Sequence, residues 1–222
     1  MDKAERYGID RSLPYVAVVM EKPDMSVYPH LTLREGYRFV RFAPEHERTW
    51  AELQYSITHT DSLEQGLQIF RTEFLGTDDE DTPAERCPRY RDVCERMVFV
   101  EDSDGHLVGT AALWTGDTFG RIRSRVHWVA VDAKHQGKGI AGAMMTRLCE
   151  LHHALGCSDV PYLTTQTWSY RAVGLYRKFG FQPYLGEKPT NWPFHSELFP
   201  QSYEQSTEAG WALIDSMQRR VI

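Results

Sequence analysis

One stretch, residues 126–155, constrains the fold more than any other, because an apolar run, a glycine turn and a long amphipathic segment follow one another there. Valine and alanine dominate residues 126–131, and β-branched residues of this kind favour a strand. Gly137, Gly139 and Gly142 come next. Beyond them, apolar residues recur every three or four positions, which predicts a helix. The stretch therefore predicts a buried strand, a turn, and a helix that begins at the turn.

Glycines at the start of a helix indicate an anion site. The first N–H groups of a helix have no partner within it, and they carry a partial positive charge. Glycine has no side chain that would keep a diphosphate at a distance. Residues 137–142 therefore predict a site for a nucleotide, with glycines that only relieve packing in a tight turn as the alternative.

The residues Gly137 to Gly142 match the dinucleotide pattern G-x-G-x-x-G literally. In that pattern the first glycine follows the strand almost directly, and an acidic residue ends the next strand. Here residues 132–136 intervene, and Asp159 precedes the next apolar run. A nicotinamide-dependent oxidoreductase stays an alternative. The P-loop pattern fails, because the residues after Gly142 are alanine and methionine.

Residues 136–141, Gln-Gly-Lys-Gly-Ile-Ala, resemble the Q/R-x-x-G-x-G/A motif of the GCN5-related N-acetyltransferase (GNAT) family, which binds the coenzyme A pyrophosphate on this turn. Residues 172–181 resemble the family's A-x-x-L-Y-x-K-x-G-F segment. The resemblance implies an α/β (α+β) fold with a GNAT-type mixed, mainly antiparallel central sheet flanked by helices. It divides the chain into an N-terminal extension at 1–35, a GNAT acetyltransferase domain at 36–185, and a C-terminal loop and helix at 186–222.

The other elements are predicted from apolar spacing and turn residues. They are strands at 15–20, 37–41, 161–168 and 181–185, helices from His46, from Ser62, at 170–179 and at 208–221, and a hairpin around 102–106. No clear seventh strand follows Leu185, so either a short one lies within 186–200 or another segment takes its place. The acidic run at 78–81 is either a solvated loop or an acidic lip that draws in an amine.

The composition argues against nucleic acid and membranes as partners. The net charge of −6 and the pI of about 5.8 come without a basic stripe for nucleic acid. No apolar run is long enough to cross a membrane, and the polar N-terminus does not resemble a signal peptide. We therefore expect a cytoplasmic protein that binds neither nucleic acid nor a membrane, and a homodimer is left open.

The cysteines form no CxxC pair, so free thiols are expected. Cys149, His152, His153 and Cys157 lie close in sequence and suggest zinc. Cys157, however, falls past Gly156, beyond the predicted helix, and no further ligand pair is apparent. No metal is predicted.

The GNAT resemblance implies acetyl-CoA as cosubstrate. It assigns the backbone of the strand end to the pantetheine arm and the thioester oxygen, and the glycine turn to the phosphates. Ser169 stands where many members have an asparagine that contacts the pantetheine. The residues expected to bind the cofactor are Val129, Ala130, Val131, Gln136, Gly137, Lys138, Gly139, Ile140, Ala141, Gly142 and Ser169.

Two residues are predicted to be catalytic. Tyr176 stands where the family often carries a tyrosine that donates to the leaving thiolate, with an ordinary core-packing tyrosine as the alternative. Leu163 and Thr164 occupy the strand on which some members place a glutamate base, and neither can accept a proton near neutral pH. His127 resembles a histidine of the arylalkylamine acetyltransferases and is the predicted base, with a structural strand histidine as the alternative.

These assignments predict an N-acetyltransferase that moves an acetyl group from acetyl-CoA to a primary amine by direct attack in a ternary complex. The acceptor is a small-molecule or peptide amine. A non-catalytic acyl-CoA sensor is the remaining alternative, and it would bind acetyl-CoA without transferring its acetyl group.

Overall fold

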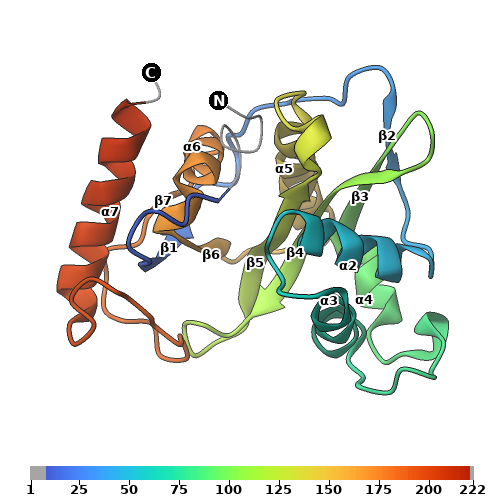
Figure 1. The fold of residues 1–222 in the computed structure, drawn as a ribbon, viewed down its shortest axis with the longest axis horizontal. Helices are drawn as coiled ribbons and strands as arrows, with labels where there is room; N and C mark the ends of the chain where they lie inside the picture. The colour runs from blue at the N-terminus through green and yellow to red at the C-terminus, as the bar shows by residue number, and fades with distance from the viewer. Residues whose placement is uncertain (1–8, 221–222) are drawn as a thin grey trace. The chain divides into compact units, whose positions relative to one another are not determined.

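The structure, a computed structural model, describes residues 9–220. Its strands form a seven-stranded sheet in the order β2-β3-β4-β5-β6-β1-β7 (Figure 1). The strands are β1 (Ala17–Glu21), β2 (Tyr37–Val40), β3 (Met97–Asp102), β4 (Leu107–Gly116), β5 (Arg123–Val131), β6 (Tyr162–Gln166) and β7 (Gln182–Pro183). β2 with β3, β3 with β4, and β1 with both β6 and β7 pair antiparallel, whereas β5 with β6 is parallel. A mixed, mainly antiparallel sheet flanked by helices confirms the predicted fold class.

The helices include one irregular segment, the π-helix η1 (Phe70–Leu75), which continues α3. The α-helices are α2 (His46–Ser56), α3 (Leu63–Ile69), α4 (Tyr90–Arg96), α5 (Ile140–Ala154), α6 (Tyr170–Lys178) and α7 (Tyr203–Arg219). The 3-10 helices are η2 (Ala84–Arg86), η3 (Ala133–His135) and η4 (Thr167–Ser169). Within residues 9–220, none of these helices has the length and apolar character needed to cross a membrane.

The described residues divide into two compact units. Unit 1 contains residues 9–29, 114–127 and 152–220, and unit 2 contains residues 30–113 and 128–151. Strands β4 and β5 and helix α5 each contribute residues to both units. The two units are described separately below.

Strand β1 holds unit 1 together. It lies between β6 and β7, with Ala17 opposite Gln166 and Met20 opposite Pro183. The segment before residue 36 therefore supplies a strand that is flanked on both edges. Residues 186–200 contain no strand, only an isolated bridge from Ser196 to Val16, so the second alternative holds, and β1 takes the place of the missing strand.

Both faces of β1 are buried. Ala17 and Val19 belong to an aromatic cluster with Tyr162, Trp192 and Tyr203. Val16 and Val18 pack against α7 at Gly210, where a Cβ atom would lie 2.8 Å from Val16 Cγ1. A strand buried on two faces reads as a continuous apolar run, which is what residues 15–20 show.

Unit 2 is built around the contact between α2 and α3. A Cβ atom at Gly66 of α3 would lie 2.9 Å from Ala51 Cβ of α2, so the two backbones approach closely. The predicted cap is confirmed, because the Ser62 hydroxyl accepts a hydrogen bond from the Gln65 N–H at 3.1 Å. Trp50 and Phe70 are fully buried and lie 5.2 Å apart between ring centroids.

Most predicted elements are found, with shifted ends. The hairpin is confirmed between β3 and β4, with Gly105 at φ 82° in its turn. Helix α7 begins at Tyr203, five residues before the predicted start at Glu208, because the Ser202 hydroxyl caps it by accepting from the Gln205 N–H. The sequence S-x-x-Q at 202–205 carries this signal. Helix α4 was not predicted, and it begins without a capping side chain.

Candidate functional site

In unit 2 the predicted strand, turn and helix are all present. β5 ends at Val131, and η3 follows, capped by the Asp132 carboxylate, which accepts from the Lys134 N–H at 2.8 Å. Gly137 and Gly139 then take φ values of 75° and 87°, which residues with a Cβ atom rarely adopt. The glycines are therefore required by the backbone of the turn.

Helix α5 begins directly at this turn. The Gly139 carbonyl accepts from the Ala143 N–H at 3.0 Å, the first bond of the helix. The N–H groups of the first turn, which belongs to Ile140, Ala141 and Gly142, have no carbonyl within the helix to bond. This end therefore has unpaired N–H groups of the kind that can bind an anion.

The space around the glycines differs from one to the next. A Cβ atom on Gly139 would meet nothing within 4 Å, and Gly139 is exposed. A Cβ atom on Gly142 would lie 2.7 Å from Leu31 Cδ1. Gly142 thus has a packing reason of its own, whereas the space at Gly139 is open to a ligand.

Side chains fix the turn to the rest of unit 2. The Gln136 side chain donates from Nε2 to the Val131 carbonyl at 3.0 Å, while its Oε1 is buried without a hydrogen-bond partner. The His135 Nδ1 lies 3.0 Å from the Tyr37 hydroxyl, and the Lys138 ammonium lies 5.7 Å from the centroid of the Tyr37 ring. The predicted residues Gln136 and Lys138 therefore hold the loop in shape.

The end of β5 is irregular at Trp128, which has a φ of 48°. Positive φ in a bulky residue outside a turn is a strained conformation. Val129 is half-buried, and Ala130 and Val131 are buried. The three residues assigned to the pantetheine arm thus follow directly on a distorted position of the strand.

In unit 1, Tyr176 lies on α6 and is 8% exposed. Desolvation by burial raises the pKa of Tyr176 to about 12. Its ring centroid lies 6.3 Å from that of Phe181, and its carbonyl accepts from the Phe179 and Phe181 N–H groups. The hydroxyl therefore keeps its proton at neutral pH.

Helix α7 lies beside α6 and fixes it at two points (Figure 1). The Gln218 side chain donates to the Tyr170 carbonyl at 2.6 Å and accepts from Arg177 at 2.7 Å. Arg177 also forms an ion pair with Asp215 at 2.7 Å. The helix that carries Tyr176 is thus held at its first residue and next to the tyrosine.

Ser169 and His127 also belong to unit 1. The Ser169 hydroxyl accepts from the Gln166 side chain at 3.0 Å. His127 is half-buried on β5, two residues after Arg125, the register partner of Tyr162 on β6. Arg125 donates to the Thr164 hydroxyl at 2.8 Å, so this threonine is occupied.

The acidic run is partly explained by its own hydrogen bonds. The Asp79 carboxylate accepts from the Thr82 hydroxyl at 2.5 Å and from the Asp81 N–H at 3.0 Å, which lowers the pKa of Asp79. Arg71 donates to the carbonyls of Asp79 and Thr82 and pairs with Glu47 at 2.5 Å. The run is therefore an ordered loop.

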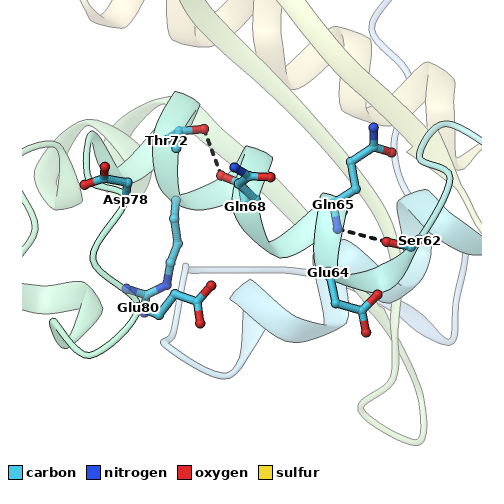
Figure 2. A pocket seen from close by; sticks show the side chains of 8 residues that line it. Ser62, Glu64, Gln65, Gln68, Thr72, Asp78 and Glu80 are labelled. Atoms are coloured by element: carbon cyan, nitrogen blue, oxygen red, sulfur yellow. Dashed lines mark hydrogen bonds between the residues drawn. The ribbon is translucent and has the colours of Figure 1, made fainter.

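A polar pocket of about 470 Å³ lies between this loop and α3. Figure 2 shows the carboxylates of Glu64, Asp78 and Glu80 around it. All three side chains are exposed. The pocket is an acidic surface hollow of unit 2, formed by the helix and the loop together.

The residues considered for zinc are grouped differently from the sequence pattern. His152, Cys157 and Asp159 have ligand atoms within 4.8 Å of one another. The Asp159 carboxylate accepts from both the Ser124 N–H and its hydroxyl. Structural zinc sites use four protein ligands, whereas this group has three. That the protein binds no metal stays a prediction.

Comparison with known proteins agrees with the fold and the motifs. The model of the acetyltransferase (GNAT) family matches residues 63–181, just over half of the chain. The chain belongs to the GNAT family. Its mainly antiparallel sheet also removes the dinucleotide-binding alternative, since that fold needs a parallel sheet.

Two relatives are similar over part of the chain. A glucosamine 6-phosphate N-acetyltransferase of Trypanosoma brucei brucei is 31% identical over 88 residues, which are 38% of this chain and 57% of that protein. N-acetyltransferase 8B of Homo sapiens is 30% identical over 95 residues, which are 42% of this chain and 41% of that protein. The matches thus cover about half the length of these relatives.

Solved structures show the same fold. A GCN5-related N-acetyltransferase from Sphaerobacter thermophilus has a TM-score of 0.55 at 21% identity, over 82% of this chain and 51% of that one. A GNAT-family acetyltransferase from Colwellia psychrerythraea has a TM-score of 0.53 at 13% identity, over 76% of this chain and 53% of that one.

Proposed function

We propose that the protein is an N-acetyltransferase that binds acetyl-CoA on the glycine turn and transfers its acetyl group to a primary amine in a ternary complex. One observation supports this more than any other. The turn has two exposed glycines at positive φ at the start of a 15-residue helix, and a Cβ atom at Gly139 would meet only open space. A diphosphate can approach this backbone closely.

The proposed reaction has one covalent exchange. The amine nitrogen attacks the thioester carbonyl carbon, the C–N bond forms, and the C–S bond breaks. The amine loses a proton, and the leaving thiolate of coenzyme A is protonated. Backbone N–H groups of Val129–Val131 are assigned to the thioester oxygen, Ser169 to the pantetheine arm, His127 to the amine proton and Tyr176 to the thiolate.

Tyr176 is best suited to hydrogen bonding. A thiol has an ordinary pKa of about 8.5, and the pKa of Tyr176 is about 12. Full transfer of the phenol proton to the thiolate is therefore uphill, whereas donation of a hydrogen bond keeps the proton on oxygen. The proton that finally neutralises the thiolate comes from solvent.

Calorimetry is the direct test of the cofactor. We expect acetyl-CoA to bind, NADPH to bind far more weakly, and an amine panel with thiol detection to show release of coenzyme A. Absence of heat with acetyl-CoA would remove the proposal. Tight binding without thiol release to any amine would favour the sensor alternative.

Replacing His127 with glutamine tests the base. A histidine base works only when neutral, so protonation of the base should give kcat/KM of the wild type an acidic limb. The His127→Gln variant should lose about tenfold or more in rate and should lack this acidic limb.

The matched control is His106→Gln, because this side chain is 77% exposed in the hairpin turn. It should retain both the rate and the acidic limb. If His127→Gln also keeps the wild-type limb, the base is another group.

A further inference from the structure

Glu73 and Trp128 form a pair that the sequence gives no reason to connect. Glu73 lies on the π-helix η1, and its Oε2 accepts a hydrogen bond from the Trp128 indole N–H at 3.1 Å. Both residues belong to unit 2. The indole donor stabilises the ionised carboxylate.

The backbone is irregular on both sides of this bond. A π-helix is rare and occurs often at functional sites. Trp128 has a φ of 48° within a strand, a conformation that costs free energy and persists where the surroundings enforce it. Two separate distortions thus bring one carboxylate and one indole together.

Two aromatic side chains pack against the Trp128 indole. The Trp128 ring centroid lies 5.2 Å from that of Trp50 and 6.2 Å from that of His59. Trp50 is fully buried, whereas Trp128, His59 and Glu73 are half-buried. A carboxylate that accepts from the edge of an indole and is partly open to solvent is suited to an ammonium group, through an ion pair.

The pair also lies next to the proposed cofactor strand. Trp128 directly precedes Val129, and a strand rises about 3.3 Å per residue, so the Trp128 backbone lies within about 10 Å of that of Val131. An amine held at Glu73 is therefore on the same unit as the backbone assigned to the thioester.

We propose that Glu73, positioned by the Trp128 indole, binds the protonated nitrogen of the primary-amine acceptor. This inference rests on the proposed acetyl transfer and adds the residue that binds the acceptor. Glu73 binds the ammonium form, which then gives its proton to the base, assigned above to His127, before the nitrogen attacks.

The test compares charged and neutral ligands on four proteins. Phenethylamine, putrescine and glucosamine, with 2-phenylethanol as the neutral match of the first, are titrated by calorimetry with and without coenzyme A. The proteins are the wild type, Glu73→Gln, Trp128→Phe and Glu64→Gln. Glu64 is the control, since it is an exposed carboxylate on α3.

At least one amine should bind the wild type about tenfold or more tightly than the alcohol binds. Glu73→Gln, in which the amide oxygen can still accept from the indole, should weaken amine binding and raise the amine KM about tenfold or more. Its kcat and its acetyl-CoA affinity should change little. Trp128→Phe keeps a ring but loses the donor and should raise the amine KM about threefold. Glu64→Gln should match the wild type.

Three results would overturn the inference: equal affinity for phenethylamine and the alcohol, an unchanged amine affinity in Glu73→Gln, or no amine binding by the wild type. Loss of stability cannot produce the expected pattern, because the ratio of amine to alcohol affinity does not depend on the folded fraction. The titrations need no acetyl transfer, so failure of acetyl-CoA to bind is a separate result that counts against the proposed function.

Discussion

Replacing Gly139 with alanine should weaken acetyl-CoA binding on the order of 10- to 100-fold. The new Cβ atom meets no protein atom within 4 Å, so the loss comes from the space that the diphosphate needs. A φ of 87° also becomes unfavourable and lowers the free energy of unfolding by about 1 kcal/mol. Calorimetry gives the affinity, and denaturant unfolding gives the stability.

Gly105→Ala is the matched control for this experiment. Gly105 has a φ of 82° in the hairpin turn, and a Cβ atom there also meets nothing within 4 Å. Its substitution should lower the stability by a similar amount and leave the affinity for acetyl-CoA unchanged. Equal affinities in the two variants would show that the diphosphate does not approach Gly139.

Replacing Tyr176 with phenylalanine should lower turnover about tenfold or more while acetyl-CoA binding stays nearly intact. The ring and its packing on Phe181 are retained, and only the hydroxyl donor is lost. Single-turnover acetylation with thiol detection measures the effect. Phe181→Leu is a useful control, because it disturbs the same packing without removing the donor.

The pH dependence separates the two catalytic assignments. Because burial raises the pKa of Tyr176 to about 12, the phenol stays protonated throughout the range from pH 6 to 10. Tyr176→Phe should therefore lower the rate by the same factor across that range. A ratio that changes with pH would mean that the phenol ionises during turnover.

Local signals predicted much of the fold. The strand, turn and helix at 126–155 and the cap at Ser62 depend on neighbouring residues, so the sequence displays them directly. The place of β1 depends on pairing with residues far along the chain, which periodicity does not encode. Helix α7 begins before its predicted start because its N-cap, Ser202, precedes the apolar stripe from which the helix was predicted.

For the candidate site, too, local patterns could be predicted from the sequence, whereas contacts between distant segments could not. Gly137 and Gly139 were selected by pattern, and their positive φ values give the physical reason. Gly142 belongs to the same pattern, but its closeness to Leu31 appears only in three dimensions. Glu73 was not predicted, since its hydrogen bond with Trp128 joins two segments that no motif relates.

The position of β1 has a consequence for biosynthesis. Ala17 leaves the ribosome well before its partner Gln166, and at about 5 to 20 residues per second the delay is on the order of 10 to 30 s. During that interval the apolar strand has no edge to join and is a natural client for a chaperone. Nascent chains arrested before β6 should therefore be more prone to aggregate than chains arrested after α7.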